Sequence, residues 1–164
     1  MIFVTVGTHE QPFDRLIQAI DQLKGTGALE DEIIIQKGYS TFVPQNCQYF
    51  DVLPYEQMIE YQKNARIIIT HGGPASFIYP LSIGKVPIVV PRQKRYNEHV
   101  NDHQLEFCRQ LKERGFPIIL IEDMKVLSEQ IANYGGDGVR VEFNSNNTIF
   151  LEKFKSIVEE LFNT

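Results

Sequence analysis

The stretch "IIITHGGPAS", residues 67–76, decides how this sequence is interpreted. A run of isoleucines is typical of a buried β-strand, and a histidine, two glycines and a proline end it abruptly. Gly72 and Gly73 would let the backbone approach a ligand closely, and Pro74 suits the first turn of a helix. The stretch therefore predicts a strand, a tight turn and a helix. The turn itself is a phosphate site, a metal site or only a corner of the fold.

The same alternation of strand and helix continues along the whole chain. Strand patterns occur at 2–6, 32–36, 49–52, 66–70, 86–90 and 117–121. Helical spacing of apolar residues occurs at 13–24, 55–65, 75–83, 100–115, 124–134 and 148–162. Because the strand runs are almost continuously apolar, both faces of the sheet must be covered by helices.

These patterns predict an α/β fold: a single Rossmann-like domain over residues 1–164, with a parallel sheet of about six strands and helices on both faces. The core would span 2–134, and a C-terminal loop and helix would occupy 135–164. Within that last part, the Gly/Asn-rich passage 135–147 is expected to be a surface loop.

Composition narrows the function. The chain has 164 residues, which suits one domain, and its formal net charge of −5 argues against a general nucleic-acid binder. No apolar run approaches the roughly 20 residues that a membrane span needs, and the start "MIFVTVGT" has no signal-peptide pattern. Cys47 and Cys108 form no CxxC motif. We therefore expect a soluble, cytoplasmic protein with reduced thiols and no disulfide framework.

Ligands of an open parallel sheet bind beyond the carboxyl ends of its strands, so four loops matter most. They begin after Val6, Gln36, Thr70 and Val90. In the third loop, the amides of Ala75 and Ser76 would open a helix whose dipole favours a phosphate, and the Ser76 hydroxyl would add a donor. The alternative is a corner in which the glycines serve packing alone. Neither a GxGxxG motif nor a P-loop is present.

The fourth loop is long and polar. Arg92, Lys94 and Arg95 gather positive charge in an otherwise acidic chain. Residues 97–104 add amide, carboxylate and imidazole groups of the kind that recognise sugar hydroxyls. The alternative is a solvated loop whose Asn101 or Asp102 caps the next helix.

A metal site is the third possibility for these loops. His99 and His103 are four residues apart and would share one face of a helix, with His9 and His71 as further ligands. The sequence has no HExxH motif and no cysteine near this pair. We therefore expect no metal.

Four motifs together resemble a known family. They are "VTVGTHEQPFDRLI", "IIITHGGPAS", "GKVPIVVPR" and "NDHQLEF", and the match runs from about residue 2 to 134. In this order they are similar to the carboxyl-terminal, donor-binding half of family 28 glycosyltransferases. The likeness is greatest to the small catalytic subunits of two-component bacterial capsule and exopolysaccharide galactosyltransferases. It extends to the small subunit of the eukaryotic dolichol-linked GlcNAc transferase.

The resemblance implies the C-terminal half of a GT-B enzyme that binds a UDP-sugar without a metal or another cofactor. The implied donor-binding residues are Gly7, Thr8, His71, Gly72, Gly73, Ala75, Ser76, Arg92, Asn101, His103 and Gln104. Among them, the glycine loops would hold the diphosphate, Arg92 would flank the uracil, and Asn101, His103 and Gln104 would contact the sugar. His9 and Glu10 are the candidates for acceptor contact or proton transfer, although the general base can equally belong to a partner chain.

One position departs from the family pattern. A Glu that holds the ribose hydroxyls usually stands seven residues before the Pro of "GKVP", and counting back from Pro87 gives Pro80. The resemblance thus implies that the ribose is held differently here, or that nucleotide binding is weaker.

The leading hypothesis is an inverting, metal-independent transfer of a hexose, with galactose expected, onto a lipid-diphosphate-linked sugar. A membrane-anchored partner subunit would hold the acceptor at the inner face of the plasma membrane, and this chain would reach the membrane only through that partner. A non-catalytic regulatory subunit is the alternative. A hydrolase of the nucleotide-sugar epimerase type is disfavoured because it needs both GT-B halves in one chain. The sequence leaves open whether the chain forms a homodimer on its own.

Overall fold

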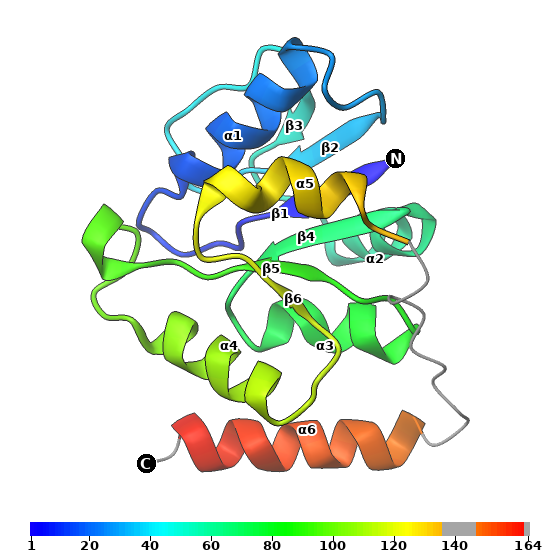
Figure 1. Ribbon diagram of the computed structural model, residues 1–164, viewed down its shortest axis with the longest axis vertical. Helices are drawn as coiled ribbons and strands as arrows, with labels where there is room; N and C mark the ends of the chain where they lie inside the picture. Colours follow the sequence, from blue (N-terminus) through cyan, green and yellow to red (C-terminus); the bar gives the residue numbers. More distant parts are fainter. Residues whose placement is uncertain (136–146, 163–164) are drawn as a thin grey trace.

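The computed structural model describes residues 1–135 and 147–162, and its centre is a sheet of six parallel strands (Figure 1). The strands are β1 (Ile2–Thr5), β2 (Ile33–Gln36), β3 (Gln48–Phe50), β4 (Ile67–His71), β5 (Ile88–Val90) and β6 (Ile119–Leu120). Their order is β3-β2-β1-β4-β5-β6. The chain therefore moves outward in one direction from β1 and in the other from β4, which makes β1 and β4 the topological switch point. This confirms the predicted doubly wound α/β fold.

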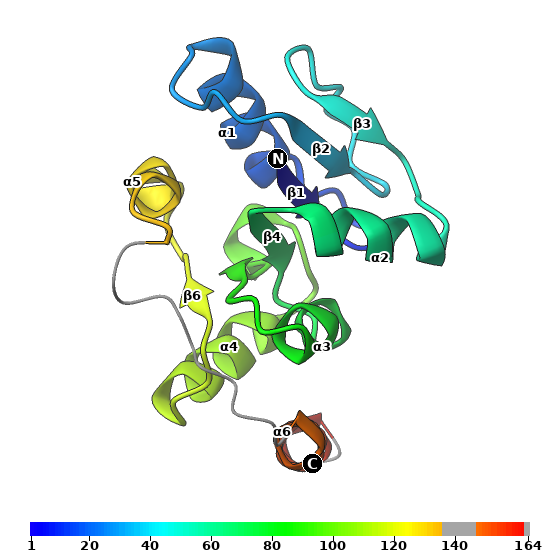
Figure 2. The ribbon, with the colours of Figure 1, turned by 90° about the vertical axis from the view of Figure 1, so that its right-hand side faces the viewer.

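Helices cover both faces of this sheet (Figure 2). They are α1 (Asp14–Gly25), α2 (Tyr55–Asn64), α3 (Ala75–Ser82), α4 (His103–Glu113), α5 (Leu127–Ala132) and α6 (Asn147–Phe162), with two 3₁₀ turns, η1 (Lys94–Tyr96) and η2 (Met124–Val126). Successive strand residues serve opposite faces: Ile2 and Val4 pack with α1 and α5, whereas Phe3 packs towards α2. The continuous apolar runs in the sequence have this cause.

The ends of several elements differ from the predicted ranges. Strand β5 begins at Ile88 because Pro87 has no N–H to donate to the ladder. Helix α4 begins at His103 rather than at residue 100. The helix expected over 124–134 divides into η2 and α5, and the carboxylate of Asp123 accepts the Lys125 N–H at the start of η2. Most of the expected surface loop at 135–147 lies outside the described residues.

Helix α6 is the outermost layer and packs over α3 and α4 (Figure 1). Its Phe154 is fully buried, and the ring meets Phe77 and Phe116 edge-on, with centroids 6.1 and 5.6 Å apart. Edge-to-face aromatic pairs of this kind add to the free energy gained by burying the rings. Helix α6 is therefore held by an aromatic cluster rather than by the sheet itself. None of the described helices is both long enough and apolar enough to cross a bilayer.

We predict that Phe154→Ala lowers the free energy of unfolding by about 3–5 kcal/mol, because a buried phenyl ring is lost and a cavity remains. Urea unfolding followed by circular dichroism measures this change. Lys155→Ala, at the exposed neighbouring position, is the matched control and should stay within about 0.5 kcal/mol of the wild type. Equal urea midpoints for the two variants would contradict the packing described for α6.

Candidate functional site

Three loops leave the carboxyl ends of the adjacent strands β1, β4 and β5 and meet at the switch point. They are the β1–α1 loop (6–13), the β4–α3 loop (72–74) and the β5–α4 loop (91–102). The second predicted loop, after β2, supports the first. A Cβ on Gly38 would collide with the carbonyl oxygen of Gly7, so these two backbones lie in close contact. The structure thus brings the predicted loops to one edge of the sheet.

The imidazole of His71 lies between two of these glycines. A Cβ on Gly7, whose φ is +73°, would lie 2.6 Å from His71 Nε2, and a Cβ on Gly73 would collide with the same ring. His71 Nδ1 accepts the Gly73 N–H at 3.1 Å. Burial, reinforced by the positive charge of Arg92, lowers the pKa of His71 to about 3. These glycines therefore make room for a neutral imidazole at the centre of the edge.

Gln104, at the start of α4, joins the β4–α3 and β5–α4 loops. Its Oε1 accepts the N–H groups of Gly72 and Arg92, each at 3.2 Å. Gly72 is buried, and a Cβ there would lie 3.0 Å from the Cβ atoms of both Gln104 and Pro91. The predicted sugar-contacting Gln104 thus also fixes the distance between the ends of β4 and β5.

Ser76 and its neighbours use their donors inside the β4–α3 loop. The Ser76 Oγ lies 2.9 Å from the carbonyl oxygen of His71 and 2.6 Å from that of Gly73, so its single proton is directed inward. The Ser76 N–H donates to the same Gly73 oxygen at 3.0 Å. With the Gly72 and Gly73 amides also engaged, the expected open phosphate cradle is closed in this conformation. Ala75 is exposed at the first position of α3.

Arg92 corrects the expectation that its side chain flanks a uracil. Only 1% of it is exposed, and its guanidinium donates to the carbonyl oxygens of Val6 at 2.8 Å, Gln11 at 2.6 Å and Glu98 at 3.1 Å. It also lies 5.0 Å from the centroid of the Phe13 ring. Burial lowers its pKa to about 10, which leaves it charged at neutral pH. Arg92 is a brace between the β1–α1 and β5–α4 loops.

A second arginine completes this brace. Arg15 forms two hydrogen bonds with the buried carboxylate of Glu98, at 2.7 and 2.9 Å, and also donates to the Pro91 carbonyl oxygen. The other Glu98 partner is the Gln93 N–H. The cluster of Arg15, Arg92 and Glu98 contains two positive charges and one negative charge. Its excess positive charge lies directly behind the loops, where it favours a bound anion.

The remaining predicted sugar contacts occupy the approach to α4. Asn101 Oδ1 accepts the His103 N–H at 3.2 Å, and Asp102 Oδ1 accepts the Lys94 N–H at 2.8 Å. The capping alternative thus describes the Asn101 side chain in this conformation. His103 is exposed at the first position of α4.

Two histidines meet across the cleft edge. The rings of His9 and His99 have centroids 4.7 Å apart, and Thr8 and Glu10 are exposed beside them. His99 precedes α4, so it does not share a helix face with His103, and that basis for a metal site is wrong. Within the described residues, no group of three or more His, Cys, Asp or Glu side chains is placed to hold a metal ion. The importance of His99 emerges only from its contact with His9.

Pro80 stands where the family pattern has a Glu that holds the ribose hydroxyls. Pro80 is buried in the core, so it does not stand at the cleft. Tyr79, three residues after Ser76, shares the face of α3 that carries Ser76. Its buried hydroxyl has no hydrogen-bond partner among the described residues.

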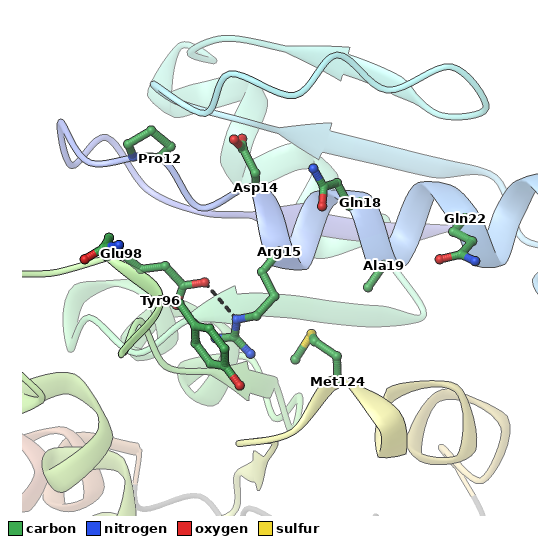
Figure 3. Close-up of a pocket in the computed structure, with 10 residues that line it drawn as sticks. Pro12, Asp14, Arg15, Gln18, Ala19, Gln22, Tyr96, Glu98 and Met124 are labelled. Atoms are coloured by element: carbon green, nitrogen blue, oxygen red, sulfur yellow. Dashed lines mark hydrogen bonds and ion pairs between the residues drawn. The ribbon is translucent and has the colours of Figure 1, made fainter. Parts of the chain in front are cut away.

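A separate hollow of about 630 Å³ lies beside the brace, between α1, η1 and η2 (Figure 3). Arg15, with its bond to Glu98, lies between Tyr96 on one side and Met124 on the other. None of its lining residues comes from the β4–α3 loop. The hollow therefore shares residues with the β1–α1 loop (Pro12) and the β5–α4 loop (Tyr96, Asn97 and Glu98) but not with the β4–α3 loop.

The lowered pKa of His71 predicts an acid-sensitive fold. Between pH 6.5 and about 3 the unfolded chain binds a proton at this imidazole that the folded chain excludes, so stability falls as the pH falls through this window. His71→Asn keeps an acceptor for the Gly73 N–H but binds no proton, so its stability should fall less steeply. Urea midpoints measured from pH 7 to pH 4 test this, with the exposed His103→Asn as control. Identical pH slopes for wild type and His71→Asn would refute the assignment.

The sequence is similar to known proteins over almost its entire length. Residues 1–161 match the glycosyltransferase family 28 C-terminal domain. Human UDP-N-acetylglucosamine transferase subunit ALG13 is 34% identical over 123 residues, which cover 70% of this chain and 10% of that protein. The mouse protein of the same name is 31% identical over 122 residues, again 10% of its length. The chain therefore spans about a tenth of these relatives.

Solved structures show the same fold at lower identity. The NMR solution structure of ALG13 has a TM-score of 0.59 and 15% identity, over 93% of this chain and 94% of that one. The glycosyltransferase SnogD from Streptomyces nogalater has a TM-score of 0.56 and 18% identity, over 99% of this chain and 42% of that one. Together with the family match over almost the entire sequence, these findings confirm the predicted resemblance: the chain belongs to the glycosyltransferase family 28 C-terminal domain family.

Proposed function

We propose that this chain is the catalytic, donor-binding subunit of a two-component glycosyltransferase. It would transfer a hexose from a UDP-sugar to a lipid-diphosphate-linked sugar in polysaccharide biosynthesis. The observation that carries the proposal is the convergence of the β1–α1, β4–α3 and β5–α4 loops at the switch point of a family 28 domain. A ligand of a doubly wound sheet binds at this place. The whole chain, 1–164, would form one donor-binding domain.

The donor would lie across the three loops. Its diphosphate would contact Gly7, Thr8 and the Gly72–Ser76 turn near His71, and its sugar would contact Asn101, His103 and Gln104. Arg92 would support this site from behind, given its burial and its three carbonyl partners. His9 and Glu10 would face the acceptor, as contacts or in proton transfer.

We propose an inverting transfer that uses no metal ion. The departing nucleoside diphosphate carries negative charge that something must stabilise. The excess positive charge of Arg15 and Arg92 over Glu98, together with the start of α3, would supply that stabilisation. Such fixed groups need no reorganisation at the moment of reaction, which is the usual advantage of a preorganised site.

The acceptor side would come from a second protein. The described residues form one sheet with one ligand edge, whereas a GT-B active site lies between two such domains. A membrane-anchored partner subunit would bring the lipid-linked acceptor to the loops at the cytoplasmic face of the membrane. The relatives in human and mouse are each named as a subunit of a transferase, which supports a shared assembly.

The identity of the transferred sugar is the most specific part of the proposal. The sequence resemblance favours galactose, in capsule or exopolysaccharide synthesis, whereas the names of the mammalian relatives specify UDP-N-acetylglucosamine. Both donors share the UDP group that the loops would hold. Transfer assays with UDP-galactose and UDP-N-acetylglucosamine side by side therefore test the sugar separately from the fold and the nucleotide.

A regulatory subunit without turnover is the second candidate. The inward-directed donors of the β4–α3 loop and the buried Arg92 head favour it, because both leave fewer groups free for a substrate. The two functions differ in what happens when a donor-contacting residue is removed. A scaffold subunit would leave the activity of its partner unchanged.

The first prediction of this proposal is metal-free nucleotide binding. Isothermal titration calorimetry in EDTA should detect UDP binding, because the positive cluster and the helix start replace a divalent ion. Uridine, which lacks the diphosphate, should bind at least about tenfold more weakly if the phosphate contacts are charge-assisted. Absence of heat at millimolar UDP, or binding only after a divalent metal is added, would overturn the proposal.

The second prediction concerns Gln104. Gln104→Ala removes the acceptor for two backbone N–H groups and lets the β4–α3 and β5–α4 loops shift relative to each other. Transfer in a membrane fraction that contains the partner should fall by about 10- to 100-fold, since small displacements of a reacting group are costly. Gln110→Ala, on the same helix, is the matched control and should retain activity. Full activity of Gln104→Ala would instead support the regulatory alternative.

A further inference from the structure

We propose that His9 and His99 act together as a pair of N–H donors that binds a phosphate oxygen at the carboxyl edge of β1 and β5. This deepens the proposed function and rests on it for the source of the phosphate, a nucleoside diphosphate. The pair brings in His99, to which no role in donor binding had been given. It also gives His9 a role that differs from proton transfer.

The pair is formed by two loops that are far apart in the sequence. His9 lies on the exposed β1–α1 loop and His99 on the β5–α4 loop, where its side chain is half-buried. Their ring centroids are 4.7 Å apart with an interplanar angle of 35°. Arg92 holds the two loops together, because its guanidinium donates to the carbonyl oxygens of Gln11 and Glu98. The contact between the rings is thus set by a buried brace.

Backbone hydrogen bonds determine where the proton of each neutral imidazole sits. His9 Nδ1 accepts the Gln11 N–H at 3.2 Å, and His99 Nδ1 accepts the Asn101 N–H at 3.4 Å. A neutral imidazole has one donor and one acceptor nitrogen, so both Nε2 atoms must carry the hydrogen. This tautomer is inferred from the hydrogen bonds. Both rings therefore carry a hydrogen-bond donor at Nε2, and the two ring centroids are 4.7 Å apart.

A phosphate oxygen is the acceptor that best fits this place. The amides of Gly72, Gly73 and Ser76, which a phosphate would otherwise use, already donate within the structure. The two Nε2–H groups supply donors on the facing loops, and the buried charge of Arg92 adds a favourable potential. A phosphate presents several oxygens with lone pairs, so it can accept from both imidazoles at once.

The same geometry reassigns the base. An imidazole whose Nε2 bears the hydrogen cannot accept a proton at that atom, and His9 can accept one at Nδ1 only by giving up the hydrogen bond from the Gln11 N–H. His9 is thus a donor in this arrangement. Proton removal from the acceptor then falls to Glu10, which is exposed next to it, or to the partner subunit.

The charges around the pair predict how binding responds to pH. Burial, His99 and Arg92 lower the pKa of His9, and only Glu10 opposes them. His71 acts on the pair from the end of β4, and the Glu98 carboxylate next to His99 is engaged by Arg15. A bound phosphate would add negative charge and raise the pKa of His9. Binding linked to protonation in this way strengthens as the pH falls.

Nuclear magnetic resonance of the imidazole nitrogens in the full chain tests the pair directly. Without ligand, both side chains should show the Nε2–H tautomer. Saturating inorganic diphosphate, and separately UDP, should raise the pKa of His9 and shift the Nε2 resonance of His99. Two probes are used because diphosphate reports the phosphate contact alone, whereas UDP also reports the nucleotide site.

Variants give a second, independent reading by calorimetry. His9→Gln keeps a neutral N–H donor but cannot ionise, so its Kd for UDP should stay within about twofold of wild type at pH 8 and weaken by about three- to fivefold at pH 6. His99→Phe removes the donor and should weaken binding about three- to tenfold at both pH values. Lys112→Gln, an exposed charge change on α4, should match wild type at both. Because UDP itself titrates near pH 6, each variant is compared with wild type at the same pH.

The outcomes separate this inference from the proposed function. If diphosphate shifts the imidazole resonances and UDP does not bind, the pair stands and the proposed function fails. If UDP binds while the imidazole resonances and the ratios between variants and wild type stay unchanged, the pair is overturned and the proposed function stands. An Nδ1–H tautomer at either histidine, or binding of neither probe, also overturns the pair.

Discussion

The buried guanidinium of Arg92 is the group on which the arrangement of the site depends. It joins the exit of β1, through the Val6 carbonyl oxygen 86 residues away in sequence, to the loop that follows β5. A buried charge without a counter-ion in contact is costly unless its donors are satisfied. Three carbonyl oxygens satisfy most of them, although the Nε atom has no partner among the described residues. The loops on either side can hold their shape only while these carbonyl groups stay in place.

The brace also sets the electrostatics of the edge. Glu98 accepts hydrogen bonds from Arg15 and the Gln93 N–H, and its charge also acts on Arg92 and raises the pKa of that guanidinium, so one carboxylate serves two arginines. A site built on this excess can attract a diphosphate without a cation of its own. The feature that positions the loops and the feature that favours an anion are therefore the same side chain.

Much of the fold follows from the sequence because a sheet covered on both faces requires continuous apolar strands. The runs at 33–36 and 67–71 could be recognised for that reason. The ends of helices and strands were harder to predict from the sequence, because they depend on local hydrogen-bond donors such as the backbone N–H that Pro87 lacks. The site was predicted as a set of loops but not as a set of contacts. The site depends on tertiary contacts that no spacing along the chain encodes. They are the inward-directed Ser76 hydroxyl, the buried Arg92 side chain and the contact between the His9 and His99 rings.

These contacts change what donor binding requires. In the described conformation the backbone N–H groups of the β4–α3 turn donate to Gln104, to His71 and to a carbonyl oxygen of the turn itself. A phosphate that entered there would have to displace these internal hydrogen bonds. Contact with the imidazole pair would break none of these hydrogen bonds. A diphosphate would therefore contact the pair first. The β4–α3 loop would open only where new contacts with the diphosphate offset the free energy of the internal hydrogen bonds that are broken. Because His9 donates in this arrangement, the proton leaving the acceptor must go elsewhere. The chemistry is then completed either by Glu10 or by the partner that brings the acceptor to this edge.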